Sequence, residues 1–135
     1  MILVICADDR DGILFNNRRL SRDSALCAHI LEHCGENVLW MNNYSASIFP
    51  QNTPNIRISE NFLEEAGAGE LCFVENTDFS RIYPQAEKII LYRWNRSYPA
   101  DRKLPADFLT GRKQSSTLDL AGNSHPCITQ EVYEL

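Results

Sequence analysis

The opening residues 1–7, Met-Ile-Leu-Val-Ile-Cys-Ala, form the longest uninterrupted apolar run of the chain and lead into the acidic stretch from Asp8 to Asp11. A continuous run rich in branched aliphatic residues is typical of a central strand that is buried on both faces of a sheet. The run is too short to span a bilayer, and it lacks the basic start of a secretory signal. We therefore expect a buried β-strand at the centre of the fold and a cytoplasmic protein.

The composition is that of an ordinary globular domain. The 135 residues are 44% hydrophobic and 23% charged, with 6 glycines and 6 prolines, which is enough apolar material to bury a core. We expect one domain over residues 1–135. The formal net charge of −5 comes without a block of like charges, which argues against nucleic acid or an anionic membrane as a partner.

Further apolar stretches alternate with segments of helical pattern. The clearest helix follows the capping residues 21–23 and ends at Gly35. Strands are expected at 1–7, 38–41, 55–58, 71–74 and 87–94, further helices at 44–49, 60–66 and 76–82, a loop at 95–113, and a terminal hairpin of 115–120 with 128–133. This order predicts an α/β fold with a mainly parallel central sheet and a C-terminal antiparallel hairpin.

The cysteines and histidines have structural interpretations. The 5 cysteines contain no C-x-x-C spacing and are expected to be small apolar residues in a reducing cytosol. His29 and His33 are spaced to hold a metal ion from one helix, but an exposed helix face explains the pair equally simply and is preferred. We predict no metal site, and His125 has no role that the sequence reveals.

Several segments are similar, in order and spacing, to those of dihydrofolate reductases. The first strand leads into residues 8–13 as that family's first strand leads into its mobile active-site loop, and residues 20–23, Leu-Ser-Arg-Asp, stand where the family has L-P-x-D or L-P-x-E. Residues 79–88 resemble a Y-x-x-x-x-P-x-A-x-x pattern, residues 101–105 resemble D-T-x-F-P, and residues 123–134 resemble the last hairpin. The resemblance implies the family's three-layer α/β fold.

The resemblance also implies a substrate site. Asp23 would be the catalytic acid that orients a pteridine ring, in a pocket whose further candidate residues are Ile5, Ala7, Leu26 and Arg102. If Ile5, Leu26 and Leu104 enclosed Asp23, desolvation would raise its pKa. The alternative is that Asp23 is a residue of the first helical turn, stabilised by the helix dipole.

The positions expected to bind the NADPH cofactor depart from the family pattern. The adjacent glycines that let the backbone approach a pyrophosphate are replaced by Val74, Glu75 and Asn76. Two like charges about 4 Å apart repel by roughly 4 kcal/mol at an effective dielectric near 20. The G-R-x-T turn is replaced by Asn42, Asn43 and Tyr44, without its base. Asn42, Asn43, Glu75 and Asn76 are therefore candidate cofactor-binding residues, although Glu75 and Asn42-Asn43 argue against NADPH.

Three functions follow from these residues: a reductase, a non-catalytic binding protein, and a structural or interaction module whose cleft is closed by side chains. We favour a divergent protein with a cleft for a pterin-like or nucleotide small molecule, with the interaction module as the alternative. Under this hypothesis, Asp23→Asn should weaken ligand binding with little effect on stability. An edge strand left open by the short chain would allow a homodimer.

Overall fold

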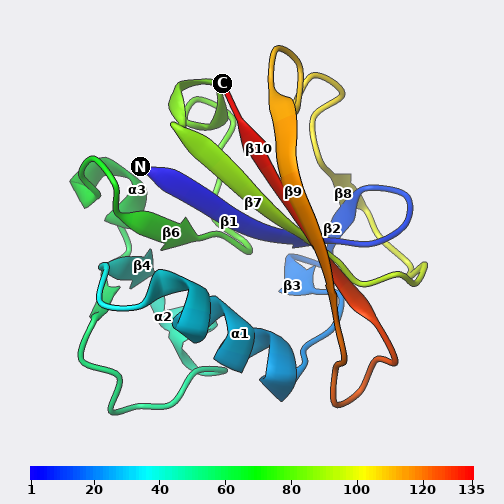
Figure 1. Ribbon diagram of the computed structural model, residues 1–135, viewed down its shortest axis with the longest axis horizontal. Coiled ribbons are helices and arrows are strands. Elements are labelled where there is room, and N and C mark those ends of the chain that lie inside the picture. Colours follow the sequence, from blue (N-terminus) through cyan, green and yellow to red (C-terminus); the bar gives the residue numbers. More distant parts are fainter.

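The computed structural model describes residues 1–135, built around a seven-stranded sheet in the order β5-β4-β6-β1-β7-β10-β9 (Figure 1). Strands β5, β4, β6, β1 and β7 run parallel, whereas β10 and β9 form an antiparallel hairpin that pairs with β7. Their bounds are β1 Ile2–Ala7, β4 Leu39–Met41, β5 Ile56–Ile58, β6 Leu71–Phe73, β7 Lys88–Arg93, β9 Lys113–Leu120 and β10 Ile128–Glu134. The predicted α/β fold with a mainly parallel sheet is confirmed.

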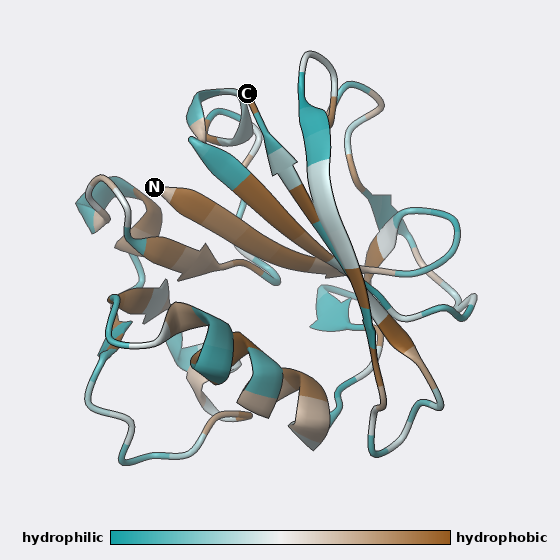
Figure 2. Ribbon diagram, in the orientation of Figure 1, coloured by the Kyte–Doolittle hydropathy of each residue, from teal (hydrophilic) through white to brown (hydrophobic).

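Strand β1 is buried on both faces, as its apolar run predicts. Leu3 and Ile5 belong to the core on one face of the sheet, whereas Val4 belongs to the core on the other. Figure 2 shows the hydrophobic residues concentrated along β1, β6 and β7 and hydrophilic residues along much of β9. Helix α1 (Ser24–Cys34) covers the Val4 face, and α3 (Phe62–Glu65) with the loop residues Phe79 and Phe108 covers the other. These are the three layers of the fold.

Helix α1 lies close to its predicted position because both of its ends have strong signals. The Asp23 carboxylate accepts hydrogen bonds from the backbone N–H groups of Ala25 and Leu26, as expected of an N-cap. The helix ends at Gly35, whose φ of +57° lies in the left-handed region that favours glycine.

A second, three-stranded sheet in the order β3-β2-β8 was not predicted from the sequence. It consists of β2 (Gly12–Phe15), β3 (Arg18–Arg19) and β8 (Arg102–Lys103). Asn16 and Asn17 form the two-residue turn between β2 and β3, with φ values of +51° and +59°. Both residues tolerate this conformation, which a type I′ hairpin requires. The β2–β3 hairpin brings Arg19 back toward the main sheet.

The other predicted helices are short or absent. Helix α2 (Asn43–Ala46) and α3 are each 4 residues long, shorter than the expected 44–49 and 60–66. The helix predicted at 76–82 is wrong: the segment is a loop that leads into a 3-10 turn, Tyr83–Gln85. Pro84 within this turn removes a backbone donor that a longer helix would need.

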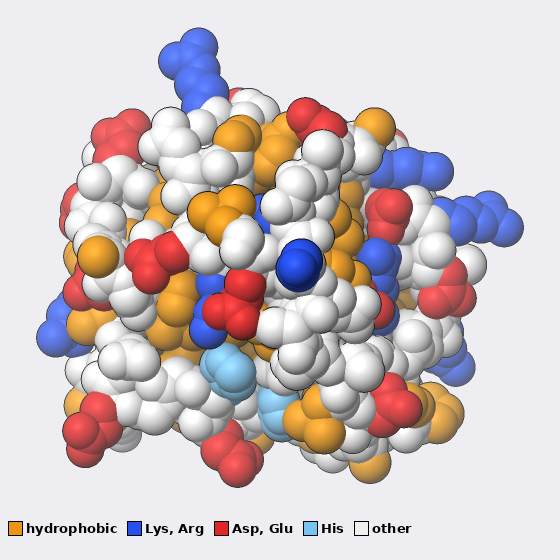
Figure 3. All heavy atoms as spheres, turned by 45° about the horizontal axis from the view of Figure 1, so that its top comes forward, with side chains coloured by type: hydrophobic (Ala, Val, Ile, Leu, Met, Phe, Trp, Pro, Cys, Tyr) orange, Lys and Arg blue, Asp and Glu red, His pale blue; other side chains and the backbone are white.

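Strand β9 is one of the two edge strands of the main sheet, and almost all of its residues are exposed. The homodimer expected from an open edge strand stays a prediction, which light scattering of the protein in solution would test. On the face in Figure 3, acidic and basic side chains are interspersed rather than gathered into a patch of one sign. No helix is both long enough and apolar enough to cross a membrane.

His29 and His33, the histidine pair on α1, contact the sheet. Nδ1 of His29 lies 2.9 Å from the Tyr92 hydroxyl, and Nδ1 of His33 lies 3.4 Å from the Gln130 amide nitrogen. The Gln130 amide also donates to Tyr92 at 3.0 Å. These contacts join α1 to β7 and β10. As expected from the sequence, the cysteines form no disulfide bond, and all of them are free thiols.

Candidate functional site

The carboxyl ends of the parallel strands meet at one edge of the sheet. In open α/β sheets ligands bind in the crevice at this edge, where successive connections leave the sheet in opposite directions. Here β1 lies between β6 and β7. Asp8, Asn42 and Trp94 directly follow β1, β4 and β7, and Glu75 is the second residue after β6. The candidate site is therefore sought between β1 and β6.

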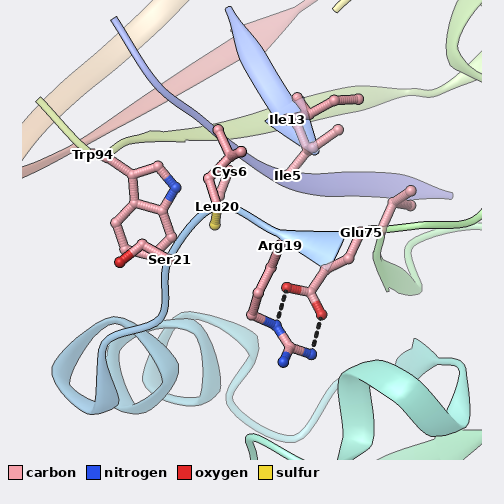
Figure 4. A pocket seen from close by; sticks show the side chains of 9 residues that line it. Ile5, Cys6, Ile13, Arg19, Leu20, Ser21, Glu75 and Trp94 are labelled. Carbon is pink, nitrogen blue, oxygen red and sulfur yellow. Dashed lines mark hydrogen bonds and ion pairs between the residues drawn. The ribbon is translucent and has the colours of Figure 1, made fainter. Parts of the chain in front are cut away.

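An ion pair occupies this crevice (Figure 4). Arg19 donates from Nε and Nη2 to the two carboxylate oxygens of Glu75, at 2.8 and 2.9 Å. The side chains of Arg19 and Glu75 are only 17% and 9% exposed. Burial would lower the pKa of Arg19, but the pairing with Glu75 raises it. This bidentate geometry is the strong form of an arginine–carboxylate contact.

Helix α2 holds both partners of the ion pair. The Arg19 guanidinium lies 4.0 Å from the centre of the Tyr44 ring and donates to the Tyr44 carbonyl at 3.1 Å. The backbone N–H of Arg19 donates to the Tyr44 hydroxyl at 2.9 Å, and the Ser45 hydroxyl donates to Glu75 at 2.8 Å. These contacts of Arg19 hold the β2–β3 hairpin at the end of the crevice.

The space left inside the crevice is about 10 Å³, roughly enough for one water molecule. Small-molecule pockets are usually a few hundred Å³ in size. The lining residues come from β1, β2, the segment after β3, and the ends of β6 and β7: Ile5, Cys6, Ile13, Arg19, Leu20, Ser21, Val74, Glu75 and Trp94. Burial raises the pKa of the Cys6 thiol, which keeps it neutral. In this arrangement the crevice is closed.

Asp23 points away from this space, toward the loop between β9 and β10. Its Oδ1 accepts the backbone N–H of Asn123 at 2.9 Å, and its Oδ2 accepts that of Ser124 at 2.8 Å. Nδ1 of His125 lies 3.2 Å from Oδ2. Burial would raise the pKa of Asp23, but the hydrogen bonds from Asn123, Ser124 and His125 hold it well below its usual value. The expectation of a raised pKa is wrong, because these donors outweigh desolvation.

His125 connects Asp23 to two hydroxyl groups. Its Nε2 lies 2.7 Å from the Tyr98 hydroxyl and 3.3 Å from the Ser21 hydroxyl. The imidazole stacks on Trp94 with a centroid separation of 4.6 Å and an interplanar angle of 28°. The side chains of His125 and Asp23 are 1% and 0% exposed. This buried cluster borders the closed crevice through Ser21 and Trp94.

The predicted substrate residues do not gather around Asp23. Ile5 lines the closed crevice, and Ala7 lies in the same core cluster, on the sheet face opposite Leu26. Arg102 is an exposed residue of β8, on the side of Asp78, whose pKa it helps to lower. Arg102 therefore does not join a pocket with Asp23. Ligand binding by these residues stays a prediction.

Three of the four predicted cofactor residues do lie together. The Asn42 amide donates to Asn76 at 2.9 Å and to Thr77 at 3.1 Å, while its oxygen caps α2 by accepting from Ser45 at 3.0 Å. Glu75, which precedes Asn76, forms the ion pair with Arg19. The backbone N–H of Asn43 instead donates a hydrogen bond to the Glu60 carboxylate.

The residues at this edge do not fit NADPH. Glu75 presents a carboxylate where a pyrophosphate would need backbone N–H groups, and the nearby cation, Arg19, is already paired with it. The amide of Asn42 is also engaged. These residues therefore support no reaction step through that cofactor.

Arg19, Tyr98 and His125 are parts of the site that were not predicted from the sequence. No local motif in the sequence places Arg19 beside Glu75. None places His125, in the segment 123–125, beside Asp23. His125 and Asp23 are 102 residues apart in the chain, and Arg19 and Glu75 are 56 residues apart.

The strand order, the antiparallel C-terminal hairpin and the covered sheet faces define a dihydrofolate reductase-like fold. Among solved structures, the chain is similar to dihydrofolate reductase from Enterococcus faecalis in complex with NADP(H) and RAB-propyl, with a TM-score of 0.69 and 12% sequence identity. The match covers 98% of this chain and 94% of that chain. No protein-family model matches the sequence, and no curated protein matches it. At this identity the likeness shows the fold alone.

Proposed function

We propose that this chain binds a small molecule in the crevice between β1 and β6 and does not carry out NADPH-dependent reduction. The observation that supports this proposal is the Arg19–Glu75 ion pair, which fills the crevice at the edge where this class of sheet binds ligands. The contacts that close the crevice are the polar contacts between Arg19 and Glu75. A ligand with matching polar groups can replace them.

The ion pair defines the chemistry of the ligand. A molecule that enters the crevice has to replace both halves of the pair, because either partner left buried alone is costly. A pterin or guanine ring offers adjacent N–H donors to the carboxylate of Glu75, and a carboxylate or phosphate on the same molecule offers a partner to Arg19. Pterin-like compounds with an acidic tail and guanine nucleotides therefore fit the proposal.

Opening the crevice reduces the apparent affinity. Separating a buried ion pair costs roughly 3–5 kcal/mol, so the open state of the crevice is only a small fraction of the molecules. The apparent affinity for a ligand that binds only the open state is reduced by that fraction. This corresponds to about two to four decades in the dissociation constant. The ligand's own contacts with Arg19 and Glu75 offset this cost, which neutral compounds of the same shape cannot do.

A thermal-shift titration with folate, dihydrofolate, GMP and NADPH tests the proposal. A ligand at one hundred times its dissociation constant stabilises the native state by about 2.7 kcal/mol, which raises the midpoint by several degrees in a chain of this size. We expect a shift with folate compounds or GMP and none with NADPH. Glu75→Gln should weaken the effective ligand at least tenfold, whereas Glu64→Gln, at an exposed glutamate of α3, should not.

The alternative function is a structural or interaction module. The observation that favours it is the cavity of about 10 Å³, since a crevice that never opens binds nothing. An absence of shift with every ligand at millimolar concentration would overturn the binding proposal in favour of this alternative. A shift with NADPH would instead restore the reductase hypothesis.

A further inference from the structure

The buried cluster behind the crevice contains a carboxylate, an imidazole and a hydroxyl in sequence. Asp23 Oδ2 lies 3.2 Å from His125 Nδ1, and His125 Nε2 lies 3.3 Å from the Ser21 hydroxyl oxygen. A hydroxyl next to a base that is itself oriented by a third group is the arrangement that activates a nucleophile. Similar arrangements occur on unrelated folds and are recognised by geometry rather than by sequence position.

The protonation pattern of the cluster follows from its hydrogen bonds. An ionised carboxylate only accepts hydrogen bonds, and Asp23 already accepts the backbone N–H groups of Asn123 and Ser124. Its contact with His125 therefore requires the proton on Nδ1. In the neutral ring, Nε2 then carries the lone pair, and it lies within reach of the hydroxyls of Ser21 and Tyr98. The imidazole is oriented as a base toward these hydroxyls.

The surroundings hold this geometry in place. Trp94 stacks on the imidazole, and the buried Asp8 carboxylate fixes the backbone of Tyr98 by accepting its N–H at 3.0 Å. The loop that carries His125 passes so close to Asp23 that a Cβ at Gly122 would lie 2.5 Å from Asp23 Oδ2. The cluster is therefore preorganised before any ligand arrives.

Ser21 lies beside the proposed ligand site. It lines the crevice cavity together with Trp94 and Arg19, whereas Tyr98 lines a separate groove above the β2–β3 hairpin. Figure 4 shows Ser21 and Trp94 at one end of the cavity and the Arg19–Glu75 pair at the other. The Ser21 residue is partly exposed, so a small electrophile reaches it when the ion pair separates.

We propose that Ser21 is a nucleophile, activated by His125 and oriented through Asp23, which hydrolyses small carboxylic esters. This inference rests on the proposal that the crevice admits a small molecule. Arg19 lies across the same cavity, so an ester with a negatively charged group is the preferred substrate.

The reaction balances without a cofactor or metal. Ser21 Oγ attacks the ester carbonyl carbon and its proton passes to His125 Nε2, while the carbonyl π electrons move to the oxygen. Collapse of this intermediate breaks the bond to the alcohol oxygen, and the leaving alkoxide takes the proton from His125. Water then attacks the acyl-Ser21 carbonyl, giving up its proton through His125, and releases the acid with Ser21 restored.

Labelling with a fluorophosphonate probe, read by intact mass and peptide mapping, tests the proposal on the whole chain. We expect one adduct, on Ser21, that is lost in Ser21→Ala and reduced at least tenfold in His125→Gln. Arg19→Met, which removes the ion pair, should accelerate labelling several-fold. Circular dichroism of each variant establishes that it is folded. Ser24, the exposed serine at the start of α1, is the internal control for unselective reaction.

An unlabelled Ser21 in both the wild type and Arg19→Met would overturn the inference, as would equal labelling of Ser24 or an adduct on Tyr98 alone. The binding titration separates this failure from failure of the proposed function. If folate or GMP binds and Ser21 stays unlabelled, only the ester hydrolysis is wrong; if neither binds and Ser21 is unlabelled, both proposals fail.

Discussion

Replacing Asp23 by asparagine should strongly destabilise the protein, contrary to the small stability effect expected from the sequence, because the buried carboxylate joins the start of α1 to the β9–β10 loop. In Asp23→Asn, one oxygen can keep the N–H groups of Ala25, Leu26 and Asn123. The new amide nitrogen then stands where Oδ2 accepted from Ser124 and His125. This places a donor against donors in a buried site.

The size of the effect follows from the lost contacts. Hydrogen bonds to a charged group contribute about 1.5–3 kcal/mol each, and a buried donor left without a partner costs a further 1–3 kcal/mol or so. Since these terms do not add fully, we expect a loss of about 3–5 kcal/mol in the free energy of unfolding. In a chain of this length, this lowers the thermal midpoint by roughly 10–15 °C.

Urea unfolding followed by tryptophan fluorescence measures this loss. Asp9→Asn is the matched control, because Asp9 is an exposed acid one residue beyond the buried Asp8, and it should change the unfolding free energy by less than about 0.5 kcal/mol. A loss below about 1 kcal/mol in Asp23→Asn would show that Asp23 is an ordinary helix cap. The account of Asp23 as the joint between α1 and the hairpin would then be wrong.

Three further predictions concern the same two clusters. The folded pKa of Asp23 lies below its unfolded value, so its contribution to stability is present above about pH 4 and is lost as the pH falls toward the folded pKa; acid unfolding of the wild type should be steeper than that of Asp23→Asn. A Cβ at Gly122 would lie 2.5 Å from Asp23 Oδ2 and 2.6 Å from the carbonyl oxygen of His125, so Gly122→Ala should cost about 1–3 kcal/mol in urea unfolding. A double-mutant cycle of Arg19→Met and Glu75→Gln should give a coupling of about 1–3 kcal/mol, and additive single effects would contradict the ion pair.

Much of the fold could be predicted because its signals are local. The apolar run 1–7 specifies a strand buried on both faces, and α1 has both an Asp23 cap and a Gly35 terminus. The hairpin at Asn16-Asn17 was missed because its strands are short and largely polar, although asparagine is common in such turns. The helix predicted at 76–82 was wrong. The prediction relied on the capping residues at its start, but the segment has no apolar face long enough to stabilise a helix by packing.

The site could be predicted only in part, because its contacts join distant segments. The family resemblance selected Asp23, but the donors that lower its pKa come from Asn123, Ser124 and His125. Local patterns do not specify which loop a carboxylate meets across the sheet. The same holds for Glu75: its charge was recognised as unsuited to a pyrophosphate, whereas its partner Arg19 depends on the unpredicted β2–β3 hairpin.

Two experiments in the same buffer test whether the crevice excludes NADPH: an assay of NADPH consumption by the wild-type protein in the presence of dihydrofolate, and calorimetric titration of NADPH and of folate. The Arg19–Glu75 pair in the crevice predicts no NADPH consumption and no heat of NADPH binding. The proposed exchange of its contacts predicts measurable binding of a pterin-like or guanine ligand. NADPH that binds and is consumed in a dihydrofolate-dependent reaction would contradict the account, because it would require Arg19 and Glu75 to vacate the crevice for the cofactor that they exclude.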